Sequence, residues 1–198
     1  MLLTVVAILE NTIAPWAPFY VAYAVLASAL PFLIGGVDAR TFQRPSLRYA
    51  LVGLGLAIPL QGIFRLMTAR ADLPAMFGEM LTVAAARLGT HPETVATSYV
   101  VFIKAWAGFG EEVFYRGYLQ RSFRSRVGPL ASITGAALLF AVRHYAQVLL
   151  AWPHVDWASA TIWVTAAFVV GVAFGWLYEK TASLWPSILC HYLFNLLG

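Results

Sequence analysis

Long apolar runs, separated by short polar segments or by segments containing glycine and proline, dominate this chain of 198 residues. A helix needs about 20 predominantly apolar residues to cross the hydrocarbon core of a bilayer. Six runs reach or approach that length, and the last of them is the shortest. The pattern therefore predicts an all-α, polytopic transmembrane helical bundle of about six spans, at residues 13–33, 47–67, 98–119, 130–150, 160–178 and 184–197.

A shorter segment between the second and third runs has an amphipathic pattern. Across residues 76–88, Met76 and Met80 recur on one helical face, whereas Glu79 and Arg87 lie off that face. A helix with one apolar and one charged face settles in the interfacial layer of a membrane instead of crossing it. We therefore expect a short interfacial amphipathic helix at this position.

The composition agrees with a membrane protein and excludes several other classes. Hydrophobic residues make up 61% of the chain and charged residues 11%, with a mean hydropathy of +0.74, whereas soluble domains average about 25% charged residues. The formal net charge of +4 comes from basic residues at the ends of the apolar runs, so no nucleic acid partner is expected. A single cysteine, Cys190, excludes an intramolecular disulfide and a cysteine-based zinc site. We expect residues 1–198 to form one integral membrane domain.

The basic residues also predict an orientation. Arginines follow the first run at 40–48 and the third run at 121–126, and Lys180 follows the fifth run. The connections on the opposite face hold fewer basic residues, and acidic residues dilute them. Because cytoplasmic loops are enriched in Lys and Arg, we expect the N-terminus outside and residues 121–126 in the cytoplasm.

Three ionisable residues inside the third run indicate a functional site. An ionisable side chain at membrane depth costs free energy unless it faces the protein interior and finds a partner. Glu112 and Arg116 are four residues apart and share a helical face, which predicts an ion pair. Glu111 is rotated by about 100° from Glu112, so we expect its carboxylate to be free to act on a ligand or a water molecule.

Two further pairs of residues have the same four-residue spacing. Phe140 and His144 lie in the fourth run, and His191 and Asn195 lie in the sixth. Counted at about 1.5 Å per helical residue, the depths of Glu111, His144 and His191 are compatible with one another. The sequence therefore predicts that these groups meet in one cavity, in the cytoplasmic half of the membrane or near its midplane.

Carboxylates, imidazoles, an amide and an arginine are together sufficient to hydrolyse an amide bond. A carboxylate can take a proton from water, a histidine can orient that water, and an amide can donate to a developing oxyanion. No Gly-x-Ser-x-Gly or His-Glu-x-x-His motif occurs, and the three aspartates fall between the runs. We expect no cofactor and no bound metal, although Glu111 and two histidines would supply the three protein ligands that a catalytic zinc requires.

In these residues the chain resembles the CPBP family of intramembrane glutamic endopeptidases (CAAX proteases and bacteriocin-processing enzymes, also called the Abi family). The resemblance covers about residues 98–198, which we interpret as the catalytic core. The family's motifs Glu-Glu-x-x-x-Arg, Phe-x-x-x-His and His-x-x-x-Asn match, in this order, Glu111, Glu112 and Arg116, then Phe140 and His144, then His191 and Asn195. One such motif alone is weak, but three in order within apolar runs are specific.

The resemblance implies a role for each polar residue of these motifs. Glu111 and His144 would activate the attacking water, and His191 and Asn195 would line the oxyanion site. The other two polar residues of the first motif would support these catalytic groups. Enzymes of this kind use glutamate chemistry, which agrees with the expectation that no metal is bound.

Four other positions in the core have structural interpretations. Arg143 directly precedes a motif histidine and is interpreted as a snorkelling or packing residue rather than a clamp for a substrate carboxylate. Gly171 and Gly175 form a small-x-x-x-small pair, which predicts close helix contact. Cys190 is interpreted as a small packing residue.

The leading hypothesis is an intramembrane endopeptidase of a prokaryotic plasma membrane, with a membrane-associated or lipid-linked peptide or protein as substrate and the lipid bilayer as its other partner. A non-proteolytic immunity or assembly factor with the same fold is the alternative, and an ion or proton conductor is a third. The chain has no repeated half, which disfavours a transporter. The sequence leaves the oligomeric state open, as well as the choice among prenylated tails, bacteriocin leaders and sorting-signal tails.

Overall fold

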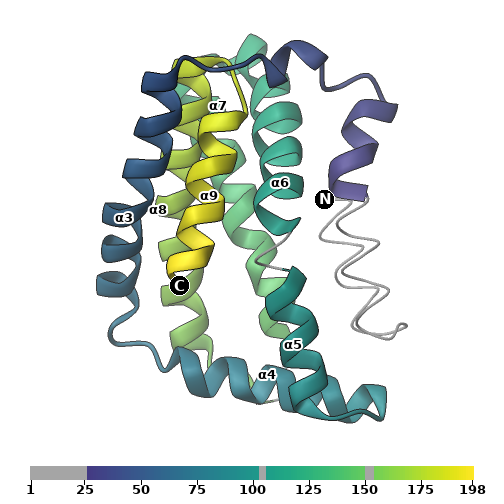
Figure 1. Cartoon of the computed structure of the whole chain (residues 1–198). Helices are drawn as coiled ribbons and strands as arrows, with labels where there is room; N and C mark the ends of the chain where they lie inside the picture. The colour runs from purple at the N-terminus through teal and green to yellow at the C-terminus, as the bar shows by residue number, and fades with distance from the viewer. Residues whose placement is uncertain (1–25, 103–105, 150–153) are drawn as a thin grey trace.

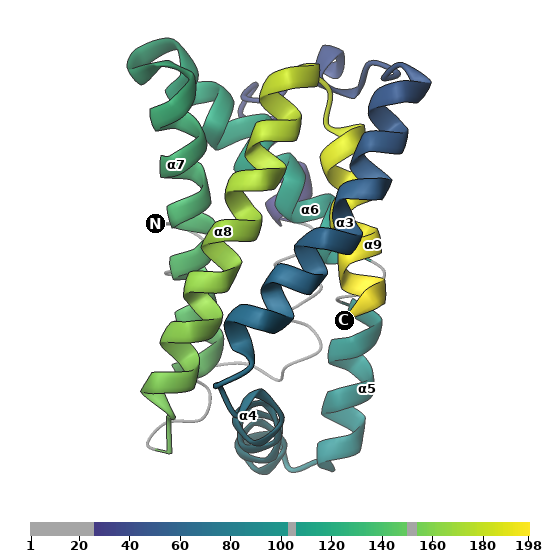
Figure 2. The same ribbon diagram turned by 90° about the vertical axis from the view of Figure 1, so that its left-hand side faces the viewer.

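The computed structural model describes residues 26–102, 106–149 and 154–198, and within these ranges the ordered elements are all helical. Its long helices run side by side as a bundle (Figures 1 and 2). The elements are, in chain order, a helical segment at 26–33, η1 (Ala39–Phe42), α3 (Leu47–Thr68), α4 (Leu73–Leu88), α5 (Pro92–Phe102), α6 (Gly108–Glu112), η3 (Val113–Gln120), α7 (Arg121–Val148), α8 (Trp157–Thr181) and α9 (Trp185–Leu197).

Three helical stretches in the described part of the chain are long and apolar enough to cross a membrane. They are α3, the continuous stretch Gly108–Val148 and α8. The predicted helices at 47–67 and 160–178 are thereby confirmed, apart from small shifts at their ends. Most of the predicted first span, at 13–33, lies outside the described residues.

The stretch Gly108–Val148 is a helical hairpin. Gly128 has a φ of 81° and a ψ of 177°, a conformation that breaks the helix and that side-chain-bearing residues rarely adopt. The chain reverses there, and α7 runs back along η3, so that the rings of Tyr115 and Phe140 lie 5.3 Å apart.

The predicted third span is wrong at both ends. Residues 98–102 belong to α5, which begins at Pro92, and the helix that carries the first motif continues past Leu119 through residues 121–126. These basic residues therefore lie on a helix and not in a loop. Hydropathy misses this extension because a helix can project beyond the apolar layer once its side chains become polar.

Helix α4 lies across one end of the bundle, nearly at right angles to the long helices (Figures 1 and 2). Asp72 caps its N-terminus by accepting a hydrogen bond from the Ala75 backbone N–H, and Gly89 ends it in the left-handed conformation. Met76 and Met80 are buried against Trp163 of α8. The amphipathic helix is confirmed, and its place in the membrane interface stays a prediction.

Helix α8 is the most buried of the long helices, and its glycines allow neighbouring helices to approach. A Cβ atom at Gly171 would lie 3.0 Å from the Phe140 ring, and one at Gly175 would lie 2.8 Å from the side chain of Gln120. The predicted close contact is therefore confirmed. At its N-terminus, hydrogen bonds from Ser159 hold the pKa of the Asp156 carboxyl below its usual range.

The short helix α9 is held against α3. The backbones approach closely at Gly53 and Pro186, where a Cβ atom on the glycine would be 2.4 Å from the proline carbonyl oxygen. At the other end of α9, the Arg65 guanidinium donates to the Leu197 carbonyl oxygen over 2.5 Å. Cys190 lies in an apolar cluster between these helices and α8, which confirms its packing role.

Candidate active site

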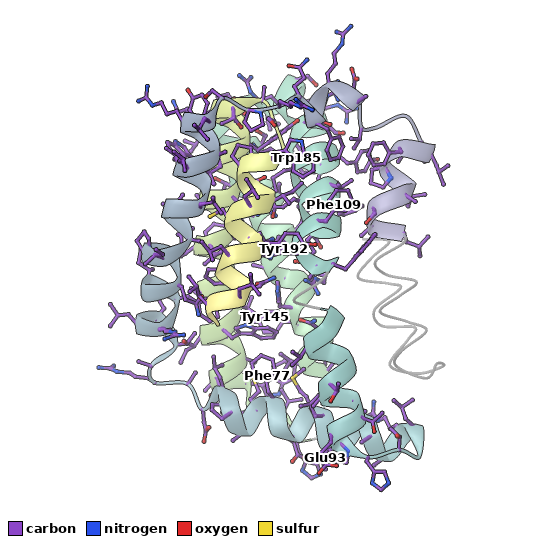
Figure 3. The ribbon with its side chains drawn as sticks, viewed as in Figure 1. Phe77, Glu93, Phe109, Tyr145, Trp185 and Tyr192 are labelled. Carbon is purple, nitrogen blue, oxygen red and sulfur yellow. The ribbon has the colours of Figure 1, made fainter. Side chains whose placement is uncertain are left out.

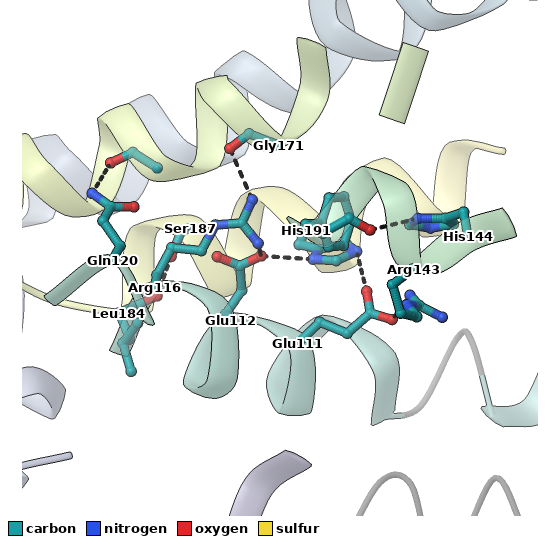
Figure 4. A network of polar contacts seen from close by, with 12 residues as sticks. Glu111, Glu112, Arg116, Gln120, Arg143, His144, Gly171, Leu184, Ser187 and His191 are labelled. Carbon is teal, nitrogen blue, oxygen red and sulfur yellow. Dashed lines mark hydrogen bonds and ion pairs between the residues drawn. The ribbon is translucent and has the colours of Figure 1, made fainter. Parts of the chain in front are cut away.

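A fully enclosed carboxylate organises one part of the site. Glu112 Oε1 accepts a hydrogen bond from Arg116 Nη1 over 3.0 Å and pairs with His191 Nδ1 at 2.9 Å (Figure 4). Glu112 and Arg116 are both 0% exposed. The predicted ion pair is confirmed, and it also holds the imidazole of the third motif.

The remaining contacts of Arg116 tie this cluster to α8. Its Nη2 donates to the Gly171 carbonyl oxygen over 2.8 Å, and its guanidinium lies over the rings of Phe140 and Phe174, 4.9 Å and 5.4 Å from their centroids. One turn later, Gln120 Nε2 donates to the Gly175 carbonyl oxygen over 2.9 Å. The two glycines therefore receive side-chain hydrogen bonds on their backbone oxygens as well as permitting close packing.

Glu111 is not free, contrary to expectation. Its carboxylate forms a buried ion pair with Arg143, which reaches it from the other arm of the hairpin (Figure 4). Of the two interpretations of Arg143, snorkelling is therefore wrong, and a packing role agrees with its burial. Buried carboxylates require a positive partner, and this one comes from a different helix. On its other side, Glu111 Oε2 lies 3.7 Å from His191 Nε2.

His144 has a defined orientation. Its Nδ1 lies 2.9 Å from the Phe140 carbonyl oxygen, one turn earlier on α7. A carbonyl can only accept, so Nδ1 carries the proton and Nε2 is the nitrogen able to take another. The edge-to-face contact with the Trp163 ring, 4.9 Å between centroids, fixes the plane of the imidazole.

A cavity of about 440 Å³ brings four of the predicted site residues together. They are Glu111, His144, His191 and Asn195, and Asn195 is half-buried at the cavity wall. The other two predicted residues lie behind this wall and do not line the cavity. The arrangement therefore separates groups that can touch an occupant from groups that can only hold them.

The cavity lies in the half of the bundle nearer α4. Leu73 and Phe77 of α4 contribute to its wall, and Figure 3 shows Phe77 at the end of the bundle far from Trp185. The expectation that the site lies in the half that holds residues 121–126 is wrong, and the alternative placement near the midplane stays a prediction. The helix that carries Glu111 runs on beyond those residues before it turns, so the basic segment lies at the opposite end.

The sequence from residue 93 to residue 197, more than half of the chain, matches the family of type II CAAX prenyl endopeptidases described as Rce1-like. The chain belongs to this family. All three motifs fall inside the matched segment, so the resemblance to CPBP proteases is confirmed. No curated protein and no solved structure matches the chain.

The chain therefore belongs to a family of proteases. Its buried cluster of Glu111, Glu112 and His191 falls at the family's active-site motifs. Among the described residues, no group of three or more His, Cys, Asp or Glu side chains is placed to hold a metal ion. The absence of a metal stays a prediction.

Sequence reasoning missed several polar residues of the site. Gln120 stands four residues after Arg116, on the same face, and this spacing was an available signal. Arg143 gave no such signal, because its partner lies 32 residues away in the chain. Gln61 and Gln147 also line the cavity, and isolated amides in apolar runs do not differ in pattern from packing residues.

Proposed function

We propose that this protein is an intramembrane endopeptidase that hydrolyses a peptide bond of a membrane-associated or lipid-linked substrate. The observation that supports this most strongly is the convergence of Glu111, His144, His191 and Asn195 on one cavity, with family membership beside it. A cavity of about 440 Å³ has room for a few residues of an extended peptide together with the attacking water.

Glu111 and His144 would activate the water. Glu111 takes the proton as the water attacks the scissile carbonyl carbon, and His144 Nε2 accepts a hydrogen bond that orients the water. Nε2 then receives this proton from Glu111 and passes it to the leaving amine nitrogen as the C–N bond breaks. The hydrogen bond from Nδ1 to the Phe140 carbonyl oxygen supports this role, because it leaves Nε2 on the working side of the ring. Arg143 would keep the Glu111 carboxylate in place between turnovers.

His191 and Asn195 would stabilise the oxyanion. Since His191 Nδ1 pairs with Glu112, Nε2 is the nitrogen that would donate to the oxyanion. It lies 3.7 Å from Glu111 Oε2, and both residues line the cavity. Asn195 would add an amide N–H from the next turn of α9, and donors of this type act on charge that develops in the transition state.

Glu112 and Arg116 would act as positioning residues. Both are enclosed by protein and neither lines the cavity, so they would fix His191 and the hairpin rather than meet the substrate. The positions of the catalytic atoms would then depend on a network of ion pairs and hydrogen bonds that is enclosed by protein. A peptidase gains from such rigidity because small displacements of reacting groups cost large factors in rate.

We further propose six membrane passes, with residues 13–33 as the first and α9 as the last. Among the described residues, the end of the bundle with η1 and the hairpin turn has seven basic and two acidic residues, and the α4 end has three basic and four acidic residues. The positive-inside rule then puts the first end in the cytoplasm, and the cavity in the outer half of a prokaryotic plasma membrane.

Labelling of introduced cysteines tests this orientation, since the native Cys190 is buried. A maleimide that cannot cross membranes should label Glu93→Cys in intact cells and Arg124→Cys only after permeabilisation. The reverse pattern would invert the orientation and turn the cavity toward the cytoplasm.

Comparative proteomics of membranes tests the enzymatic function. A host carrying the native protein should show new protein termini that are absent with Glu111→Gln. Glu93→Gln, an exposed glutamate of α5, is the matched control and should give the native set of termini. Identical termini with the native protein and Glu111→Gln would refute the peptidase function in favour of an immunity or assembly factor.

A further inference from the structure

Two glutamines in the wall of the cavity have no structural role that their contacts explain. Gln61 comes from α3 and Gln147 from α7, and each is only 7% exposed. Neither Oε1 atom has a hydrogen-bond partner within the described residues. Buried polar atoms are satisfied in nearly all native structures, so an unsatisfied pair beside an active site requires an explanation.

The other polar side chains around the cavity are engaged. Glu111 pairs with Arg143, and His144 donates to a backbone oxygen. Gln120, outside the cavity, offers a direct comparison. Its Oε1 also lacks a partner among the described residues, but its amide nitrogen donates to the Gly175 carbonyl oxygen and joins two helices. Within the described part of the chain, the amides of Gln61 and Gln147 join no helices, which leaves them available to an occupant.

Both glutamines lie next to the groups that would carry out the reaction. Gln147 stands three residues after His144, on the same face of α7. Gln61 lies beside the end of α9, where a Cβ atom at Gly198 would come within 2.9 Å of its Nε2, and Gly198 is three residues beyond Asn195. The two amides therefore extend the site from the reacting groups toward α4.

We propose that Gln61 and Gln147 form a subsite that binds the main chain of the substrate, in extended form, on the α4 side of the scissile bond. This subsite rests on the proposed peptidase function. A peptide unit presents one N–H donor and one carbonyl acceptor, and a glutamine amide presents the complementary pair. An occupant with main-chain N–H groups satisfies both buried Oε1 atoms.

The apolar part of the same wall suits the side chains of such a peptide. Phe64, Leu73, Phe77 and Trp163 surround this end of the cavity, so an extended chain would find apolar surface between its two amide contacts. Pockets of this kind combine apolar walls with a few polar groups that fix orientation. The chemistry therefore favours a segment rich in aliphatic or aromatic residues.

Helix α3 precedes the segment that matches the family, which begins at residue 93. Gln61 therefore adds a substrate contact from outside the matched core. Residues that only position a substrate affect KM before they affect kcat, unlike the groups of the three motifs.

Thermal unfolding in detergent, without any peptide, is the first test. If the amides are held unsatisfied for a substrate, Gln61→Leu and Gln147→Leu should keep or raise Tm, because an apolar side chain of similar size removes an unpaired polar atom. The matched control Gln120→Leu should lower Tm, since it leaves the Gly175 carbonyl buried without its donor. A drop in Tm for both cavity variants as large as that of Gln120→Leu would assign them a structural role and overturn the subsite.

Peptide retention is the second test and needs no turnover. Immobilised full-length Glu111→Gln protein would be loaded with a library of randomised, N-myristoylated octapeptides, and the retained amount measured by mass spectrometry. Adding Gln61→Leu and Gln147→Leu together should reduce retention at least about tenfold, and N-methylation of the backbone amides should reduce retention only where the glutamines are present. Equal retention with and without the glutamines, or no retention by the Glu111→Gln parent, would overturn the subsite. The result is separate from that of the proteomic test, because a protein that binds peptides without cleaving them would still show glutamine-dependent retention.

Discussion

Glu111 and Glu112 are neighbours in the chain, yet they belong to two different regions of the molecule. Glu111 faces the cavity and pairs with Arg143 of the other hairpin arm. Glu112 faces away from the cavity, into an enclosed cluster with Arg116 and His191. Glu112 and Arg116 are enclosed by protein, and His191 connects them to the cavity, which is accessible to an occupant.

The difference shows how a helix can turn two identical neighbouring side chains toward different surroundings. Each carboxylate has an arginine partner, so charge pairing alone does not distinguish them. The rotation of about 100° between adjacent helical residues does, because it turns one carboxylate to the cavity and the other to α8 and α9. A general base must reach water, and only Glu111 meets that requirement.

The largest expected effect is on activity, and it falls on the cavity side. Glu111→Gln keeps the size of the side chain and removes the base, so turnover should fall by roughly 10²–10⁴-fold. Turnover would be measured in proteoliposomes on a peptide taken from the new termini. Tm should fall less than for a broken buried pair, because the glutamine amide oxygen can still accept a hydrogen bond from Arg143.

Glu111→Gln/Arg143→Leu is the control for that prediction. It removes both charges and should restore the native Tm without restoring turnover. Near-native turnover in either variant would mean that Glu111 is not the base and that the contrast between the two carboxylates is not catalytic.

The enclosed cluster should respond in stability instead. Arg116→Ala leaves Glu112 buried without its guanidinium, and breaking a buried pair costs about 3–5 kcal/mol in soluble proteins. Thermal unfolding in detergent should show a large drop in Tm. Arg124→Ala is the matched control, because its pair with Glu179 is partly exposed and exposed pairs contribute about 0.2–1 kcal/mol. Equal shifts for the two arginines would show that the enclosed cluster is hydrated.

Asn195→Ala sharpens the comparison at the boundary of the cavity. Loss of one oxyanion donor typically lowers kcat by about 10²–10³-fold and leaves KM nearly unchanged. Asn195→Asp should be worse, since its charge would repel the oxyanion. Steady-state kinetics decide: a higher KM with native kcat would make Asn195 a binding residue, and a lower Tm alone would make it a helix-packing residue.

The smallest effect is expected from chelators. If water is activated by Glu111 and His144 alone, incubation of the purified protein with a zinc chelator should leave turnover unchanged. Elemental analysis should find no stoichiometric zinc. Activity that is lost to the chelator and restored by zinc would move Glu111 from the role of base to that of ligand.

Local spacing predicted much of this site. The four-residue interval between Glu112 and Arg116 predicted their ion pair, and the same interval between Gly171 and Gly175 predicted close packing. Both depend only on the geometry of one helix, which a sequence specifies directly. The three motifs also located the residues that line one cavity.

The contacts between different helices could not be predicted in this way, because no single run of residues specifies how helices pair. The partner of Glu111 is set by the turn at Gly128, because that turn fixes which residue of the second arm lies opposite. The predicted helix end at Leu119 misjudged the length of the first arm, and with it the depth of the cavity. The pairing of Arg143 with Glu111 and the cavity glutamines were missed for the same reason.

The hairpin Gly108–Val148 also has a consequence for how the protein is made. Four buried charged side chains lie on its two arms, and on insertion scales each alone would cost about 2.5–3.5 kcal/mol at the membrane centre. Glu112 and Arg116 neutralise each other within the first arm, but Glu111 finds its counter-charge only on the second. Insertion of the first arm into the bilayer is therefore unfavourable until the second arm has been synthesised. We expect the two arms to leave the translocation channel together, as one electrically neutral unit.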